Sequence, residues 1–391
     1  MTQNHQNLGA PYSQGWKSLV YTNLEETHKQ RESRNFGLDL VRASAITMVV
    51  VSHLLRPLEK LGIYGVELFF VLSGFLIGGI LVRSLLRPEG FRSGDLVRFW
   101  IRRWFRTIPN YYLFLLLYLA ATRTSATTKQ LWSYAVFFQN LAWRIFPFAV
   151  HTWSLTIEEW FYLLFPAALL LAARKTSEPE SRLRRFLYVT AIFILLPTVL
   201  RFTQSYWLGY SDARAIVISR LDAIMYGVFL AYLRAGSSRW SQLRGFWPVG
   251  LLGIAASTLL LRSHSIVAQA AAFTVIPPGF AIILPAFERW SKASGRVAGF
   301  IEHISIWSYS MYLCHMLIYM TTMQVTGYPH RSSAVKIALK CFVVLLTVGI
   351  SALNYRLFER PMTDLRERLA GPTRRTERGL GRHMEISPSG S

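Results

Sequence analysis

Arg42 and His53 share one face of the first apolar segment of the chain. Eleven helical residues at about 100° each return to within roughly 20° of the starting direction, about 16 Å further along the axis. Taken singly, Arg42 is typical of an arginine that extends to the membrane surface, and His53 of a histidine hydrogen-bonded to a neighbouring helix. Their shared face favours a functional pair, with a cation and an imidazole at different depths.

Two adjacent carboxylates, Glu158 and Glu159, interrupt the apolar sequence HTWSLTIEEWFYLLFP. Carboxylates inside a membrane are costly and point to function by default. Because neighbours on a helix point about 100° apart, at most one of the two fits a given cavity. Ser154 lies four residues before Glu158 and shares its face. A carboxylate beside a histidine orients a general base, so we expect Glu158 to lie at the depth of His53 and support it.

Glu67 begins the next apolar segment, GVELFFVLSGFLIGG, after a short turn. We expect its carboxylate to approach His53 across that turn. The predicted catalytic residues are therefore His53, Glu158 and Glu67. Deeper in the same segment, the pair Ser73-Gly74 is typical of close helix packing.

Arg103 and Arg106 lie on one helix face at the start of a third apolar segment, in RRWFRTIPNYY. Two guanidinium groups so placed could clamp a phosphate or pyrophosphate. The alternative is contact with lipid headgroups, which any basic pair at the membrane surface can make.

Three further motifs place polar side chains within apolar sequence. Arg220 and Asp222 in RLDAIMYG are close enough for a local ion pair, or they form a wall of the site. SYSMYLCHM supplies polar residues that could line the same cavity, namely Ser308, Tyr309, Tyr312 and His315. Glu359 and Arg360 in FERP are expected to fix a helix end.

The composition identifies the class of protein that must position these residues. Of 391 residues, 52% are hydrophobic and only 16% are charged, whereas a soluble domain has nearer a quarter charged. The apolar residues come in blocks of about eighteen or more, the length that a helix needs to cross a bilayer. We therefore predict an all-α, polytopic membrane protein. Cys314 and Cys341 have no metal-binding spacing, and no metal is expected.

Arginines and lysines cluster between the apolar blocks and give a net charge of +22. The positive-inside rule explains this placement, and no nucleic-acid partner is needed. About ten spans are predicted in one bundle, with both termini cytoplasmic. They lie at 38–58, 64–86, 103–122, 151–173, 186–203, 214–234, 246–262, 268–287, 304–325 and 334–357.

The segment 130–148 is apolar and aromatic, but Gln139, Asn140, Arg144 and Pro147 interrupt it. The basic linkers on either side require an even number of crossings between them, so we expect this segment to be re-entrant or interfacial. The predicted organisation is a polar cytoplasmic segment at 1–35, a transmembrane domain at 36–361 and a basic, disordered tail at 362–391. The polar start has no signal peptide, so the first span would be the insertion signal.

Seven of these stretches, in this order, resemble the acyltransferase-3 family of integral membrane O-acyltransferases. They are the R-x10-H pair at Arg42 and His53, GVELFFVLSGFLI, RRWFRTIP, WSLTIEEWFYLLFP, RLDAIMYGVFLAY, SYSMYLCH and FERP. The resemblance covers residues 36–361. Each motif is loose alone, but their shared order is specific.

The resemblance implies a ten-helix enzyme of the bacterial cytoplasmic membrane. Such enzymes move an acyl group, usually acetyl, from acyl-CoA to a hydroxyl of a carbohydrate or glycoside, such as O-antigen, capsule or peptidoglycan. It implies importance for Arg42, His53, Arg103 and Arg106, the arginines as donor-binding residues. The family more often has Asp where this chain has Glu67. Some members carry a fused hydrolase-like domain, which we expect to be lacking here.

The leading hypothesis is therefore acyl transfer, with phosphates of acyl-CoA on the arginines. His53, oriented by Glu158 or Glu67, would deprotonate the acceptor hydroxyl or carry the acyl group covalently. The alternative is a proton-coupled secondary transporter, which would also use buried histidine and carboxylates but should contain inverted repeats. A sensory or scaffolding protein leaves the buried ionisable groups unexplained. Oligomeric state and acceptor identity are not predicted.

Overall fold

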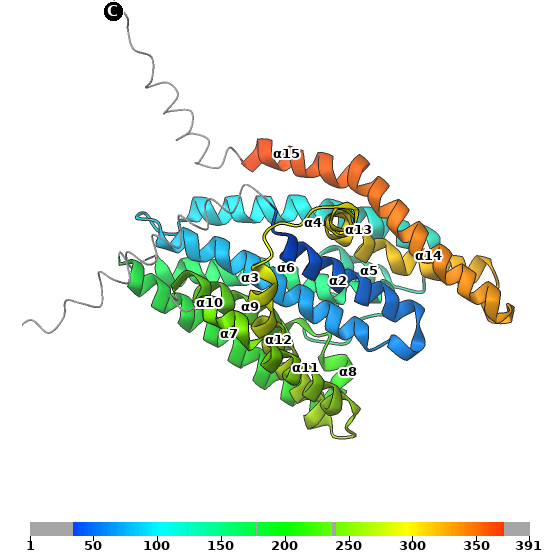
Figure 1. Cartoon of the computed structure of the whole chain (residues 1–391), viewed down its shortest axis with the longest axis horizontal. Helices are drawn as coiled ribbons and strands as arrows, with labels where there is room; N and C mark the ends of the chain where they lie inside the picture. The colour runs from blue at the N-terminus through cyan, green and yellow to red at the C-terminus, as the bar shows by residue number, and fades with distance from the viewer. Residues whose placement is uncertain (1–33, 123, 175, 177, 237–239, 371–391) are drawn as a thin grey trace, which may run out of the picture.

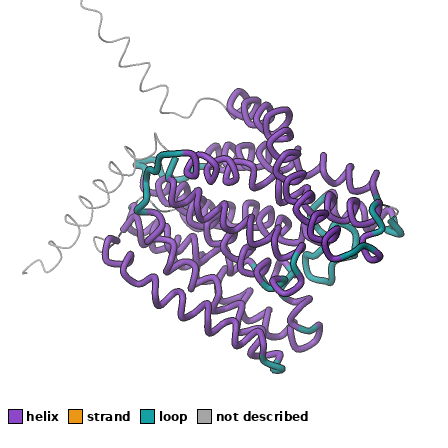
Figure 2. The backbone as a smooth tube through the Cα atoms, turned by 45° about the vertical axis from the view of Figure 1, so that its right-hand side comes forward, coloured by secondary structure: helices purple, strands orange, loops and turns teal. Residues whose placement is uncertain are grey.

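The computed structural model describes residues 34–122, 124–174, 176, 178–236 and 240–370. Across these residues the chain is helical, and the described part contains no β-strand (Figure 2). This confirms the predicted all-α class. Most of the segment expected to be polar and cytoplasmic, 1–35, lies outside the described residues, as does 371–391.

The described chain folds into a series of helices, which Figure 1 shows coloured from the N-terminus to the C-terminus. In chain order the longer ones are α2 (Phe36–Leu54), α3 (Leu61–Leu86), α4 (Ser93–Ala121), α6 (Trp153–Ala173), α7 (Pro179–Leu208), α9 (Leu221–Gly236), α11 (Trp247–Arg262), α12 (Ile266–Glu288), α13 (Arg296–Val325), α14 (Ser333–Asn354) and α15 (Arg360–Ala370). The shorter ones are η2 (Arg56–Leu58), α5 (Thr128–Ala135), η3 (Val150–Thr152), α8 (Tyr210–Ala213), η4 (Val217–Ser219), α10 (Trp240–Leu243), η5 (Arg244–Phe246), η6 (Tyr328–His330) and the π-helical turn η7 (Tyr355–Glu359).

Seven helical stretches within the described residues are long and apolar enough to cross a membrane. They are 36–54, 61–86, 150–173, 179–208, 240–262, 266–288 and 333–366. The chain is therefore a multi-pass membrane protein. The other three predicted spans correspond to α4, α9 and α13, which form helices but do not reach the same length and composition. Helix α9 has 16 residues, and α4 carries several arginines in its first half.

Several element boundaries differ from the sequence-based expectation, that of α4 the most. Helix α4 begins at Ser93, ten residues before the predicted span, because the arginine-rich stretch is itself helical.

The segment 130–148 does not form one long crossing helix, and this agrees with the prediction. Only α5, at its start, is helical, and the eight residues of α5 rise about 12 Å. Its buried Gln139 and Asn140 bond to Thr156 and to the carbonyl oxygen of Trp153, so the segment packs against the start of α6.

The C-terminal part of the described chain also differs. The predicted disordered tail was to begin at residue 362, but residues 362–370 continue the helix α15. This helix packs against α4. At the preceding turn, the buried carboxylate of Glu359 accepts hydrogen bonds from Ser310 Oγ (2.7 Å) and Asn110 Nδ2 (3.4 Å). Glu359 thus ties α13 and α4 to the helix end, as expected for FERP.

Helices α3 and α9 form the tightest contact of the bundle. A Cβ at Gly74 would overlap the carbonyl oxygen of Ile224, and one at Gly227 would overlap the carbonyl oxygen of Val71. The two backbones therefore approach closely only because both positions are glycine. This confirms the packing role predicted for Gly74.

The remaining helices surround this pair. Helices α2 and α13 pack against each other, and α2 also packs against α3. Helices α7, α11 and α12 lie on one side of the molecule, while α14 and α15 lie along the opposite edge (Figure 1). The side chains predicted to be functional come from α2, α3, α4, α6 and α13, so the centre of the bundle positions the site.

Candidate active site

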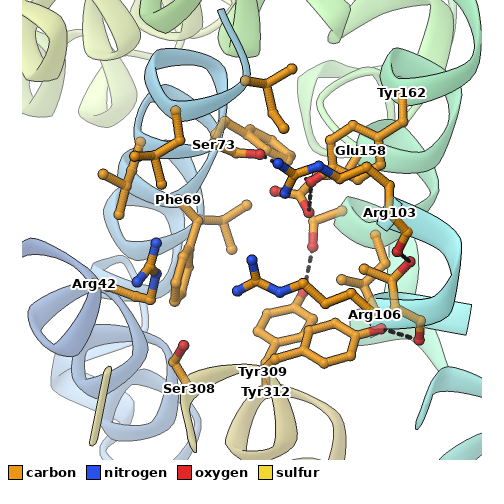
Figure 3. Close-up of a pocket in the computed structure, with 18 residues that line it drawn as sticks. Arg42, Phe69, Ser73, Arg103, Arg106, Glu158, Tyr162, Ser308, Tyr309 and Tyr312 are labelled. Atoms are coloured by element: carbon orange, nitrogen blue, oxygen red, sulfur yellow. Dashed lines mark hydrogen bonds between the residues drawn. The ribbon is translucent and has the colours of Figure 1, made fainter. Parts of the chain in front are cut away.

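A cavity of about 120 Å³ lies between α2, α3, α4, α6 and α13 (Figure 3). Arg42, Arg103 and Arg106 line it together with Glu158, and we call it the arginine cavity. The three arginines come from two helices, so the sequence alone did not require them to meet. The predicted anion-binding residues therefore share one space.

Two of the three arginines have no acidic partner. Neither Arg103 nor Arg106 forms an ion pair with another described residue, and the guanidinium carbon of Arg103 lies 5.8 Å from the centre of the Phe99 ring. Arg106 is exposed and Arg103 is partly exposed, and Glu158 lines the same cavity. Two guanidinium groups that face one cavity and form no ion pair within the protein are placed to bind an anionic ligand.

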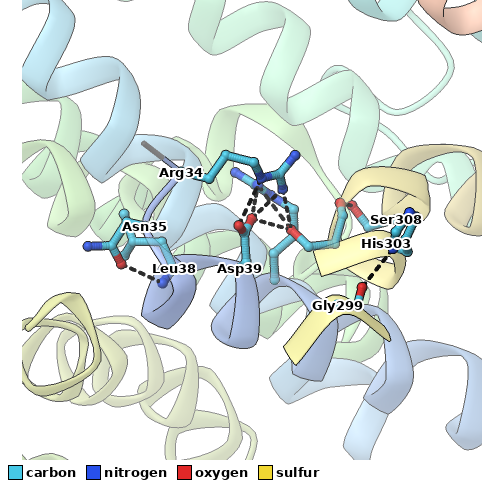
Figure 4. A network of polar contacts seen from close by, with 9 residues as sticks. Arg34, Asn35, Leu38, Asp39, Gly299, His303 and Ser308 are labelled. Atoms are coloured by element: carbon cyan, nitrogen blue, oxygen red, sulfur yellow. Dashed lines mark hydrogen bonds and ion pairs between the residues drawn. The ribbon is translucent and has the colours of Figure 1, made fainter. Parts of the chain in front are cut away.

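A polar network around Arg34 and Asp39 lies at the start of α2 (Figure 4). Arg42 belongs to this network. Its Nη1 lies 3.6 Å from Asp39 Oδ1 and donates to Ser305 Oγ at 3.3 Å. Ser305 Oγ in turn donates to Asp39 at 2.7 Å, and Arg34 pairs with the same carboxylate at 2.5 Å. Because Asp39 is shared between two arginines, it neutralises Arg42 only in part and fixes its side chain at the rim of the cavity.

Glu158 lies among these arginines and not beside His53. Its Oε2 accepts a hydrogen bond from Tyr162 Oη at 3.2 Å, and Tyr162 Oη is 3.1 Å from Ser73 Oγ. Ser154 lines the same cavity, which confirms that it shares a face with Glu158. Glu159 is buried but does not line the cavity, as predicted for adjacent carboxylates.

A second cavity, of about 100 Å³, contains His53 and is here called the histidine cavity. Ser52, Glu59, His151, Trp153 and Arg214 line it with His53, as do Val49, Gly62, Ile63, Val66 and Tyr312. Arg42 and His53 thus face different cavities towards opposite ends of α2. Their different depths in a membrane stay a prediction, and the two cavities that they line are separate.

Val66 and Tyr312 line both cavities and form the wall between them. The Tyr312 hydroxyl lies 2.5 Å from Ser154 Oγ and donates to the carbonyl oxygen of His151 at 2.5 Å. A buried hydroxyl with two partners holds its ring in one orientation. The wall is therefore a fixed aromatic side chain with a cavity on either side.

Three histidines from three elements lie in contact at the histidine cavity. The ring centres of His53 and His315 are 5.1 Å apart, and those of His151 and His315 are 5.6 Å apart. His53 Nδ1 lies 2.9 Å from the carbonyl oxygen of Val49. The sequence had named His315 as a candidate cavity residue, but His315 lines neither cavity and packs against the rings of His53 and His151. The sequence had not named His151 or Tyr162 as site residues, because an isolated histidine or tyrosine carries no spacing signal.

Glu67 does not approach His53, contrary to the expectation. It lines neither cavity, and its carboxylate forms a buried ion pair with Arg220. Arg220 also lies over the Phe273 ring, 4.9 Å from its centre. Asp222 pairs instead with Arg201 at 2.7 Å, so the prediction of a local ion pair between Arg220 and Asp222 is wrong. The partner arginines lie far away in sequence, which is why spacing alone misassigned them.

A third, larger cavity carries no such chemistry. It measures about 710 Å³ and lies between α7, α9, α11 and α12, lined mainly by aliphatic and aromatic side chains. No cluster of His, Cys, Asp or Glu in the described part of the chain could hold a metal ion. The candidate site therefore consists of the arginine and histidine cavities.

The fold and the site define a multi-pass helical membrane protein with an anion-attracting cavity at the centre of its bundle. A family model described as an acyltransferase domain matches residues 35–356, and the chain belongs to this family. This confirms the resemblance drawn from the motifs. No solved structure matches the chain.

Named relatives are similar over part or most of the chain. The O-acetyltransferase OatA of Staphylococcus aureus (strain NCTC 8325 / PS 47) is 26% identical over 355 residues, which cover 83% of this chain and 57% of the relative. The peptidoglycan O-acetyltransferase OatA of Listeria monocytogenes is 35% identical over 173 residues, 39% of this chain and 27% of the relative. The match thus spans little more than half the length of the Staphylococcus relative and about a quarter of the Listeria one.

Proposed function

We propose that this protein is an O-acetyltransferase of the bacterial cytoplasmic membrane. It would move an acetyl group, or another acyl group, from acyl-CoA to a hydroxyl of a cell-envelope carbohydrate or glycoside. The observation that carries the proposal is the arginine cavity, which Arg103 and Arg106 line and where neither of them forms an ion pair with another described residue. The family and the names of the relatives support the reaction class.

The donor would bind through its phosphates on Arg103, Arg106 and Arg42. A water molecule needs about 10–15 Å³ of such space, so a cavity of about 120 Å³ suits a small acyl thioester and not a whole nucleotide. The adenosine phosphates would therefore remain at the mouth of the cavity. Glu158, among the arginines, would set the charge of this donor site.

The acceptor hydroxyl would bind in the histidine cavity and lose its proton to His53. Because Val66 and Tyr312 separate the two cavities, transfer requires Tyr312 to leave its hydrogen bonds and open the wall. The hydroxyl oxygen then attacks the acyl carbon, the carbon–sulfur bond breaks, and the thiolate takes up the proton. The named activity of the Listeria relative makes peptidoglycan a first acceptor to test.

The test uses membranes containing the full chain, radiolabelled acetyl-CoA and purified peptidoglycan. Loss of one charged hydrogen bond costs about 1.5–3 kcal/mol, so Arg103→Gln and Arg106→Gln should each raise the KM for acetyl-CoA at least about tenfold. Arg98→Gln, on the same helix but not lining the cavity, is the matched control. An unchanged KM in both cavity variants would remove these arginines from the donor site.

A second measurement tests His53 and the transporter alternative. His53→Gln should lower turnover about 100-fold or more, the usual contribution of a general base, with expression in the membrane verified. Full product without the imidazole would exclude His53 as the base. In proteoliposomes, an enzyme consumes acetyl-CoA in proportion to acylated product, whereas a proton-coupled transporter gives sustained solute flux without acyl transfer.

A further inference from the structure

His315 and His53 carry the same tautomer, fixed by the backbone. His53 Nδ1 lies 2.9 Å from the Val49 carbonyl oxygen, and His315 Nδ1 lies 2.7 Å from that of Tyr312. A carbonyl oxygen only accepts hydrogen bonds, so each Nδ1 carries the proton. Each neutral ring is therefore left with Nε2 as a nitrogen that can accept a proton.

The Nε2 atom of His315 is buried without a hydrogen-bond partner among the described residues. His315 is 2% exposed, so bulk water does not solvate this nitrogen. An unsatisfied buried acceptor costs about 1–3 kcal/mol. Such an atom is understandable if its partner is present only at one stage of a reaction.

Among the rings in contact with His315, the His53 ring has the nearest centre, at 5.1 Å, against 5.6 Å for His151 and 5.8 Å for Tyr312. In the neutral protein both Nε2 atoms are acceptors, so the two rings cannot hydrogen-bond to each other through them. Once His53 takes a proton on Nε2, it becomes a donor. The ring centres are 5.1 Å apart, close enough for one N–H···N hydrogen bond after a rotation of the His53 side chain.

We propose that His315 is a positioning residue that shares the proton taken up by His53, so that the two imidazoles act as one base. This rests on the proposed function. The hydroxyl proton moves to His53 Nε2 and is held between the two Nε2 atoms while the oxygen–carbon bond forms and the carbon–sulfur bond breaks. The same proton then passes to the thiolate sulfur, and no proton is gained or lost.

Other groups around the pair are compatible with this role. His151 lies beside His315, with ring centres 5.6 Å apart, and its own Nε2 is also buried without a partner in the described chain. His151 can stabilise the shared proton from the side of His315 that is away from His53. Glu59 and Arg214 line the cavity together with His53.

Kinetics with a chemical rescue tests the pair. His315→Ala should lower kcat about 100-fold, within the range for a lost proton acceptor, and leave the KM for acetyl-CoA unchanged. Added imidazole should restore kcat by at least about tenfold, whereas thiophene, of similar shape but without a basic nitrogen, should not. Equal rescue by both compounds, or full kcat in the unrescued variant, would overturn the proposal.

A second measurement needs no substrate. Nitrogen NMR of the purified full chain with isotope-labelled histidine reports which ring nitrogen is protonated. The His53 and His315 signals, assigned by comparison with His53→Gln and His315→Gln, should show protonated Nδ1 and bare Nε2. Protonated Nε2 in neutral His315 would overturn the proposal even if acyl transfer is established. Conversely, if the chain shows the expected tautomers but has no transfer activity, the proposed function is wrong and the tautomer assignment stands.

Discussion

Tyr312 and Ser154 are joined across the wall between the two cavities, with 2.5 Å between their hydroxyl oxygens. The Tyr312 hydroxyl also donates to the backbone carbonyl oxygen of His151, which lines the histidine cavity on the other side of the wall. One hydrogen-bonded ring therefore connects α13 to the start of α6 and keeps the donor and acceptor spaces apart. In the proposed reaction this contact determines whether the thioester meets an alcohol or water.

Removing the Tyr312 ring should uncouple cleavage of the thioester from acyl transfer to the acceptor. In Tyr312→Ala the two cavities merge, so water can reach the thioester, and acetyl-CoA hydrolysis without acceptor should rise roughly tenfold. Tyr312→Phe keeps the ring and should keep the ratio of released thiol to acylated product within about twofold. The measurement is thiol release with and without acceptor. An unchanged ratio in the alanine variant would show that the ring is not the barrier.

Neutralising Glu158 should strengthen donor binding. Its carboxylate lies among the arginines that would hold the phosphates, and like charges in a buried site repel strongly. We expect Glu158→Gln to lower the Kd for CoA several-fold, as measured by titration calorimetry of the purified chain. Glu159→Gln is the matched control, because Glu159 is the adjacent buried carboxylate outside the cavity. Weaker CoA binding in the Glu158 variant would assign that carboxylate a direct contact with the donor.

Breaking the Glu67–Arg220 pair should destabilise the bundle more than removing both charges. Both side chains are at most 1% exposed, so Arg220→Met leaves a buried carboxylate without its cation and should cost about 3–5 kcal/mol. The double variant with Glu67→Gln should recover part of this loss. Thermal unfolding in detergent measures the difference. Equal stability of the single and double variants would mean that the pair contributes no electrostatic coupling.

The sequence predicted the features that depend on residues close together in the chain, but not the contacts between distant helices. Apolar runs and glycine patterns are local, and they predicted the membrane class and the close approach at Gly74. The sequence predicted that two arginines of the arginine cavity face the same way, because Arg103 and Arg106 lie three residues apart on one helix. The partners of Glu67 and Asp222 depend on which helices pack together, and no spacing within a motif records that.

The placement of Glu158 shows the same limit. Its depth along α6 suggested His53 as the partner, but depth does not fix the direction in which a side chain points. In the structure Glu158 lines the arginine cavity, where Tyr162 of the same helix donates a hydrogen bond to it and Ser73 of α3 contacts the Tyr162 hydroxyl. His151 was overlooked because its proximity to His315 arises only when α13 packs beside the start of α6.

The proposed count of ten spans makes α13 the decisive helix. Its 30 residues rise about 45 Å, enough to cross a hydrocarbon core of about 30 Å. Its polar side chains lower its apolar character, yet Ser305, Ser308, Ser310 and His315 are buried against other helices and do not meet lipid. Helix α13 should therefore cross the membrane, with its two flanking loops on opposite sides.

Cysteine labelling in intact cells tests this crossing. With the exposed Cys341 replaced by Ser, Ala293→Cys marks the loop before α13 and His330→Cys the loop after it. Both positions are exposed, so differences in reactivity will report the side of the membrane and not burial. A membrane-impermeant maleimide should label the second position directly and the first only after permeabilisation. Labelling of both from outside, or of neither, would place the loops on one side and reduce the number of spans.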